Sequence, residues 1–204
     1  MTVISLISCS GAPGVTTTAL ATAAALTATD VDEPVMVELA SSGGVVASQY
    51  GLPTEPGLTS LALAIGSDQP ELLAHAQELP GGLPVVFAPP SSSRTGKLLD
   101  AKARLLSQYL QETPATVIAD CGRVAATTPL LPILERSSLI GLVVRPSREN
   151  FHLAATTSVE LSEAAADPLP MGWVVVGHCP WSHDEIIGRY GLPVLSVIAE
   201  DRLG

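Results

Sequence analysis

The chain has 204 residues, of which 47% are hydrophobic and 3% aromatic, and its formal net charge is −10. This length predicts a single domain, residues 1–204, with a core of Ala, Val, Leu and Ile. The acidic surplus, without any lysine or arginine cluster, argues against nucleic-acid binding. The sequence has no basic leader and no run of ~20 consecutive apolar residues, so we expect a cytoplasmic protein without membrane insertion.

The first apolar segment, 3–7, predicts a buried strand, and the Ala-, Leu- and Thr-rich segment 19–28 predicts a helix. A glycine-containing loop joins them. Backbone N–H groups of such a loop and the positive end of the helix dipole converge on one point, which favours an anion. We therefore expect a phosphate-binding loop made of Gly11, Ala12, Pro13, Gly14, Val15, Thr16 and Thr17.

Two positions of this loop depart from the phosphate-binding pattern G-x-x-x-x-G-K-[ST]. Gly14 and Thr16 match it, and the Thr16 hydroxyl is a candidate magnesium ligand. Cys9 stands in the place of the first glycine. Val15 stands in the place of the lysine that contacts the β- and γ-phosphates. The loop therefore keeps the second glycine and the threonine of the pattern but lacks its lysine.

This stretch resembles the loop of the MinD/ParA family of P-loop ATPases, which reads K-G-G-x-G-K-[ST]. Gly11, Gly14 and Thr16 match that pattern, whereas Ser10 and Val15 replace its two lysines. The loop is similar to that of an actinobacterial branch with valine and threonines in these places. The resemblance implies a P-loop fold with a degenerate nucleotide site and argues against ATP hydrolysis.

The next apolar segment, 34–40, predicts a strand that enters a loop at Ser41. In the family an aspartate follows this strand, in a switch loop that acts on the attacking water and the metal. Ala40 and Ser42 stand there instead, so the resemblance implies that a second catalytic element is missing. Glu38 either points at the site or is a strand-end carboxylate held by local partners.

Glycines and prolines divide residues 45–77 into short helices, with His75 expected at the surface. Segment 83–87 predicts another strand. The serine-rich segment 91–96 that follows is typical of a mobile loop. Spaced leucines then predict a helix over 97–111.

A third motif is the apolar run from Thr116 that ends in Asp120-Cys121-Gly122-Arg123. Taken alone, Asp120 is typical of a strand-end aspartate that caps the next turn. In the family this aspartate holds magnesium through water, and the glycine lets the backbone approach the γ-phosphate. The resemblance thus implies a magnesium site at Thr16 and Asp120, and a switch region of Ala40, Asp120, Gly122 and Arg123.

Strands and helices alternate to the end of the chain, and Ser147 is a good N-cap for the helix that it precedes. We expect elements at 129–136 (helix), 138–144 (strand), 148–167 (helix), 171–177 (strand), 184–190 (helix) and 193–198 (strand). His178 lies near the place of a family asparagine that contacts adenine. The pattern predicts a three-layer α/β fold of the P-loop NTPase type, whose mostly parallel sheet has helices on both faces and its crevice at the strands' carboxyl ends.

Cys9, Cys121 and Cys179 each follow a predicted strand. Their odd number in a cytoplasmic protein argues against structural disulfides. Three thiols at one crevice could form a metal or redox site, but His178-Cys179 is the only adjacent Cys/His pair. Small buried residues at tight turns are the simpler interpretation.

Three functions remain open at this point. The first is a non-hydrolysing MinD/ParA-like regulatory or scaffold protein in cellular positioning, such as partitioning, division, or secretion and pilus assembly. The second is an active ATPase switch in which Arg94, Arg123, Arg145 or a partner chain supplies the missing cation. The third is another anion-binding enzyme on the same fold.

Cofactor and partners follow from the first two hypotheses. Two alternatives are equally supported: the protein binds ATP or ADP with magnesium, or it binds no cofactor at all. We expect a protein partner and a homodimer, and no nucleic acid. No basic amphipathic helix is found at the C-terminus, which argues against a reversible membrane cycle unless the sequence is truncated there.

Overall fold

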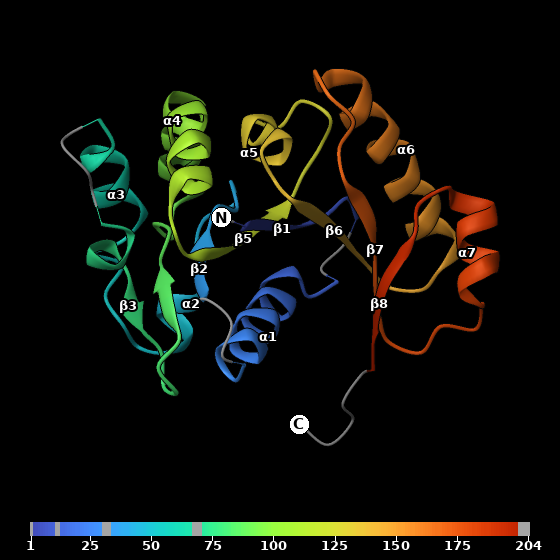
Figure 1. The fold of residues 1–204 in the computed structure, drawn as a ribbon, viewed down its shortest axis with the longest axis horizontal. Coiled ribbons are helices and arrows are strands. Elements are labelled where there is room, and N and C mark those ends of the chain that lie inside the picture. The colour runs from blue at the N-terminus through green and yellow to red at the C-terminus, as the bar shows by residue number, and fades with distance from the viewer. Residues whose placement is uncertain (1, 11–12, 30–33, 67–70, 200–204) are drawn as a thin grey trace.

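The structure is a computed structural model that describes residues 2–10, 13–29, 34–66 and 71–199. Within these residues, eight strands form one sheet in the order β3-β4-β2-β5-β1-β6-β7-β8 (Figure 1). All neighbouring strands are parallel except β3 and β4, so the predicted mostly parallel sheet is confirmed. The strands are β1 (Thr2–Ser8), β2 (Pro34–Glu38), β3 (Gln77–Glu78), β4 (Pro84–Val86), β5 (Thr116–Arg123), β6 (Leu139–Val144), β7 (Met171–Val176) and β8 (Val194–Ile198).

Helices cover both faces of this sheet, as the sequence predicts (Figure 1). One face packs against α3, α4, α5, α6 and α7, and the other against α1 and α2. The helices are α1 (Val15–Thr27), α2 (Val46–Gln49), α3 (Leu58–Ala64), the 3₁₀ turn η1 (Leu72–His75), α4 (Ser92–Glu112), α5 (Leu131–Glu135), α6 (Arg148–Ala164) and α7 (His183–Tyr190). In the described part of the chain, no helix has both the length and the hydrophobicity that spanning a bilayer requires.

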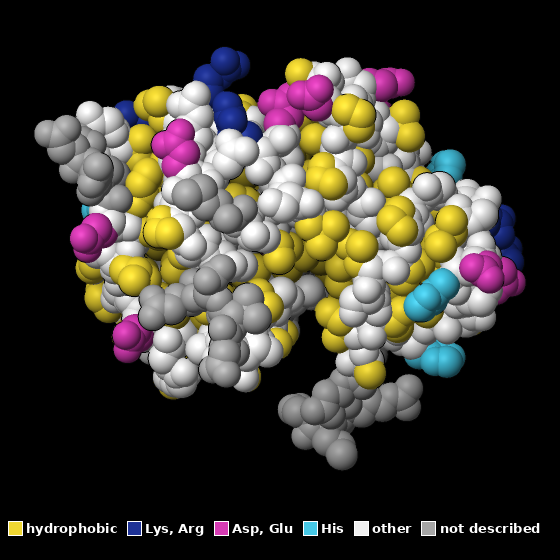
Figure 2. All heavy atoms as spheres, in the orientation of Figure 1, with side chains coloured by type: hydrophobic (Ala, Val, Ile, Leu, Met, Phe, Trp, Pro, Cys, Tyr) yellow, Lys and Arg dark blue, Asp and Glu magenta, His cyan; other side chains and the backbone are white. Residues whose placement is uncertain are grey.

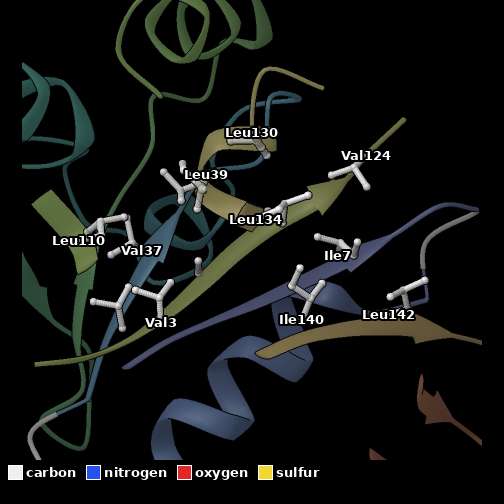
Figure 3. Close-up of a cluster of buried hydrophobic side chains, with 14 of the residues drawn as sticks. Val3, Ile7, Val37, Leu39, Leu110, Val124, Leu130, Leu134, Ile140 and Leu142 are labelled. Atoms are coloured by element: carbon white, nitrogen blue, oxygen red, sulfur yellow. The ribbon is translucent and has the colours of Figure 1, made fainter. Parts of the chain in front are cut away.

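The larger of the two cores is aliphatic in its centre. Figure 3 shows side chains of three strands in this core, with Val3 and Ile7 on β1, Val37 on β2 and Ile140 on β6. Every residue of β2 is buried, because both of its faces are covered. Burial of this kind on both faces explains why these strands are continuous apolar runs in the sequence.

The predicted loop at 91–96 is wrong, because α4 already begins at Ser92. Ser91 is the N-cap, and its hydroxyl oxygen accepts a hydrogen bond from the backbone N–H of Arg94 at 3.4 Å. The Thr95 hydroxyl donates to the carbonyl of Pro89, which fixes the first turn. The serines and Gly96 lower intrinsic helix propensity, and these capping contacts offset that cost.

Strand β5 is irregular where it approaches the predicted site. Leu6 on β1 pairs with Asp120, but the next residue, Ile7, pairs with Gly122, so Cys121 has no β1 partner. Such a bulge bends the strand and redirects its side chains. Gly122 accommodates the bend with a left-handed backbone, at φ +60°.

Four aromatic side chains pack together near the β7–β8 side of the sheet, around α6 and α7. The Phe151 ring stacks on Tyr190, with ring centroids 4.9 Å apart. It meets Trp173 and Trp181 edge-on, at 5.2 Å and 6.0 Å. This cluster contains both tryptophans of the chain and fixes α7 against α6.

Candidate functional site

The predicted loop lies between β1 and α1, so the strand, loop and helix occur in the expected order. Gly14 is the N-cap of α1 and adopts φ +94°, a left-handed conformation that favours glycine. Gly14 has no side chain with which to cap this helix start. Pro13 is buried and Thr17 is exposed. Gly11 and Ala12 lie outside the described residues.

Val15, in the place of the loop lysine, is buried and 6% exposed. It belongs to the apolar cluster that also contains Leu6, Ala19 and Val143. Its side chain therefore contributes to packing between α1 and the sheet. This position supplies no charge to an anion at the helix start.

Thr16 and Asp120, the predicted magnesium residues, are brought together. The Thr16 hydroxyl donates to the Asp120 carboxylate, which also accepts the backbone N–H of Gly122 at 3.0 Å. Burial raises the pKa of Asp120 to about 6, and these two hydrogen bonds and the nearby Glu38 carboxylate modify that effect. Asp120 is only 1% exposed, so its charge is poorly solvated.

Glu38 of β2 lies beside Asp120 of β5 in the paired strands, and its carboxylate is held by backbone N–H groups. Its Oε1 accepts the backbone N–H groups of Val45 and Val46 at 2.9 and 3.0 Å. Its Oε2 accepts the N–H of Ala88 at 3.0 Å. Of the two interpretations, the locally held strand-end carboxylate is therefore the one that the contacts support, because Glu38 ties the switch-loop segment to β4.

Ala40 and Gly122, two of the predicted switch residues, lie in contact. A Cβ atom added at Gly122 would lie 2.6 Å from the Cβ of Ala40. Glycine at 122 thus suits both the left-handed backbone and the close approach of the loop after β2. The alanine that replaces the family aspartate takes part in packing at this point.

Ser10 forms a contact that sequence reasoning missed. Its hydroxyl donates to the Oδ1 atom of Asn150 at 3.2 Å. The Asn150 Nδ2 donates to the carbonyl of Arg145, and the Asn150 backbone N–H donates to the Ser147 hydroxyl, so the predicted N-cap is confirmed. The side chain in the place of the first family lysine is therefore joined to the start of α6. An asparagine three residues after an N-cap serine carries no signal for this pairing, because the contact spans 140 residues.

Two of the three candidate arginines flank the first strand. Arg123 ends β5, which pairs with β1, and Arg145 follows β6, which pairs with the other edge of β1. Both are exposed. Arg94 lies in the first turn of α4, beyond β4. The positive charge of Arg123 acts next to the loop, where it lowers the pKa of Cys9 against the larger effect of burial.

The cysteines do not form one cluster. Cys9 and Cys121 are buried, and burial raises the pKa of their thiols to about 11 and about 12. Cys179 is half-buried at the end of β7, two strands away from β1. Among the described residues, no three His, Cys, Asp or Glu side chains are placed to hold a metal ion together.

His178 is exposed and lines a hollow of about 480 Å³ at the carboxyl ends of β7 and β8. Cys179, Trp181 and His183 line the same hollow. The hollow lies at the same edge of the sheet as the loop and Asp120, where open α/β sheets bind their ligands.

Neither protein-family models nor curated proteins match this chain in sequence. Solved structures match it closely in fold. A ParA family ATPase from Chlorobium tepidum superposes with a TM-score of 0.82 and 18% identity, over 98% of this chain and 84% of that one. MinD from Pyrococcus horikoshii, complexed with Mg-ADP, gives 0.71 and 17% over 98% and 82%.

A third similar structure is cobyrinic acid a,c-diamide synthase from Mycobacterium smegmatis with bound ADP and magnesium. Its TM-score is 0.71 at 18% identity, over 100% of this chain and 89% of that one. These likenesses show that the chain has the fold of MinD/ParA-type P-loop ATPases, as the sequence predicts. At such identities they concern the fold alone.

Proposed function

We propose that this chain is a MinD/ParA-type protein that does not hydrolyse ATP and acts as a regulatory or scaffold protein. The observation that carries the proposal is the charge balance around Asp120. The buried carboxylate has another carboxylate, Glu38, as its charged neighbour, and the lysine position holds a buried valine. Transition-state charge on a transferred phosphoryl group requires a cation at the helix start, and Val15 supplies none there.

The process we propose is cellular positioning: partitioning, division, or assembly of secretion and pilus machinery. The names of the similar structures support this class, since they include a ParA family ATPase and a septum site-determining protein. Such a role requires a protein partner, and we propose a homodimer as the working form. The acidic chain, at net charge −10, disfavours nucleic acid as the partner.

A protein can bind a magnesium nucleotide without hydrolysing it, and some of the residues present fit such a ligand. The left-handed Gly14 and the start of α1 would hold phosphate, and the paired Thr16 and Asp120 would hold the metal. Magnesium would supply positive charge to the phosphates when bound. Val15 does not fit, since it offers neither charge nor a hydrogen bond.

An alternative function is an ATPase switch whose cation comes from elsewhere. The exposed Arg123 and Arg145, on either side of β1, favour this alternative. A guanidinium supplied by the chain or by a second copy could replace the lysine. It would have to restore several kcal/mol of transition-state stabilisation.

The deciding experiment is calorimetry of Mg-ATP and Mg-ADP binding, with a phosphate-release assay in parallel. We expect no phosphate release from the wild type. Hydrolysis that Asp120→Asn abolishes would contradict the proposal and support the switch. A dissociation constant below about 100 μM, or −5.5 kcal/mol, would show that nucleotide still binds.

Val15→Lys tests whether the rest of the site is intact. We expect it to strengthen ATP binding at least tenfold, because it returns a cation to the helix start. Val15→Met is the matched control, since it has a similar length and no charge. A gain with methionine would point to packing, and no gain with lysine would show that the site has been rebuilt for another purpose.

A further inference from the structure

A groove of about 570 Å³ lies between the start of α6 and α7, apart from the phosphate-binding loop. Two arginines and two aromatic rings are among its lining residues. The others are an isoleucine, a glutamate and a glycine. The lining consists of Arg148, Trp181, Glu185, Ile186, Gly188, Arg189 and Tyr190.

The aromatic walls of the groove are held from behind. Trp181 and Tyr190 are half-buried, and both contact the ring of the fully buried Phe151, at 6.0 and 4.9 Å between centroids. Their exposed edges therefore form a preorganised apolar surface. Rigid aromatic surfaces of this kind lose little conformational entropy on binding.

The two guanidinium groups are available for a ligand. Arg148 and Arg189 are exposed, and neither has an ion pair with any described residue. The Arg189 Cζ lies 5.9 Å from the centroid of the Tyr190 ring, which keeps this cation next to the aromatic wall. Arginine beside an aromatic ring suits planar anions such as carboxylates.

Acidic groups lie near these arginines, but among the described residues none forms an ion pair with them. Glu185 lines the groove, but its Oε2 accepts the backbone N–H and the hydroxyl of Ser182 in a capping box. Asp184 and Glu149 are exposed on the first turns of α7 and α6. Figure 2 shows cationic and anionic side chains next to each other over α7. These carboxylates keep their charge and repel an anion, so a ligand must place its negative charge directly at the arginines.

A glycine keeps the groove open. Gly188 lies within α7, where glycine costs about 0.5–1 kcal/mol relative to alanine. A Cβ added there would meet no atom within 4 Å, so packing does not require glycine at this position. A larger side chain at 188 would enter this open space and narrow the groove that Gly188 lines.

We propose that this groove binds an acidic peptide segment of a partner protein. Carboxylates of the segment pair with Arg148 and Arg189, and an apolar side chain between them lies against Trp181 and Tyr190. The inference deepens the proposed scaffold function by assigning it a partner surface. The proposed peptide site contains no residue of the phosphate-binding loop, so the Val15→Lys result neither supports nor contradicts it.

The probe is a fluorescein-labelled peptide of twelve residues with Glu-Leu-Glu at its centre, compared with the same peptide carrying Gln-Leu-Gln. We expect the glutamate peptide to bind the full chain at least tenfold more tightly, and high salt to weaken it. The two tryptophans give separate indole N–H signals in NMR. The signal of Trp181 should shift on binding, and that of the buried Trp173 should shift far less.

Two variants test the location. Gly188→Leu fills the groove, and Arg148→Ala combined with Arg189→Ala removes its cations; each should weaken binding at least tenfold. Gly96→Leu on α4 is the matched control, because that glycine is also helical with open space around it. Thermal unfolding verifies that every variant is folded. Any one of four results would overturn the proposal. The glutamate peptide does not bind at 1 mM, or both peptides bind equally. Alternatively, Gly188→Leu binds the glutamate peptide as tightly as the wild type, or a DNA oligonucleotide displaces the peptide.

Discussion

At the ends of β2 and β5, buried carboxylates are held by backbone N–H groups, whereas around α6 and α7 four aromatic rings pack against one another. Glu38 and Asp120 together accept four backbone N–H groups and are each 1% exposed. Phe151 and Trp173 are equally buried but contribute apolar contacts. The two regions border the same sheet and are stabilised by different forces.

The difference shows where this protein can respond to its surroundings. Electrostatic free energy at the carboxylate region depends on pH and on cations. Apolar packing at the aromatic region depends on neither. A change in pH therefore acts on the carboxylate region, while the packing of the aromatic region is unaffected. Four substitutions test this contrast.

The largest effect is expected for Phe151→Ala, which should lower the free energy of unfolding by about 4 kcal/mol at every pH. Phe87→Ala is the matched control, because Phe87 is also fully buried but has no ring partner among the described residues. We expect it to cost about 1 kcal/mol less, since ring–ring contacts are not lost. Urea unfolding measures both. Equal costs would show that the aromatic cluster has no special contribution.

Asp120→Asn should remove a pH dependence of about 3 kcal/mol. The pKa of Asp120 rises from 3.8 to about 6 in the folded protein, mainly through burial. Its contribution to stability is therefore complete below pH 4 and is lost as the pH rises through 6. Urea unfolding of wild type and variant between pH 4 and 7.5 gives the difference. Asp100→Asn, at an exposed position of α4, is the control, and parallel curves for Asp120→Asn and wild type would refute the effect.

Gly122→Ala should cost about 2 kcal/mol, from a left-handed backbone and from a contact of 2.6 Å with the Cβ of Ala40. Adding Ala40→Gly should recover about half of this, because it removes the contact and leaves the backbone strain. Gly191→Ala separates the two causes, since Gly191 has φ +76° and no atom near its absent Cβ. The midpoints of thermal unfolding give the ranking. No recovery in the double variant would mean that the loop after β2 does not pack closely on Gly122.

The smallest effect is expected for Ser10→Ala, at about 1 kcal/mol, because it removes one hydrogen bond, to Asn150. Ser162→Ala is the control, since its hydroxyl bonds within its own helix. Faster amide exchange at the start of α6 in Ser10→Ala alone would show that the serine joins the loop to this helix. Identical exchange in both variants would count against that link.

Local sequence patterns predict most of this fold and the elements that carry the candidate site residues. The apolar strands, the glycine loop, the aspartate of β5 and the N-cap at Ser147 all depend on neighbours within a few residues. The start of α4 was missed because serines and a glycine carry weak helix propensity, and capping contacts decide the outcome. The hydrogen-bond donors to Glu38 are not predictable locally, because one of them, the N–H of Ala88, lies 50 residues away. The gathering of aromatic rings around Phe151 depends likewise on tertiary packing.

The close approach of the chain at Ala88 to Gly44 restricts how this sequence can change during evolution. A Cβ at Gly44 would lie 2.4 Å from the carbonyl oxygen of Ala88 and 2.5 Å from the Oε2 atom of Glu38. Loss of the Glu38 carboxylate removes only the second obstacle, because the carbonyl belongs to the backbone. Among natural relatives, we therefore expect position 44 to stay glycine even where position 38 varies, and a deep mutational scan should show no replacement of Gly44 rescued by a change at 38 alone.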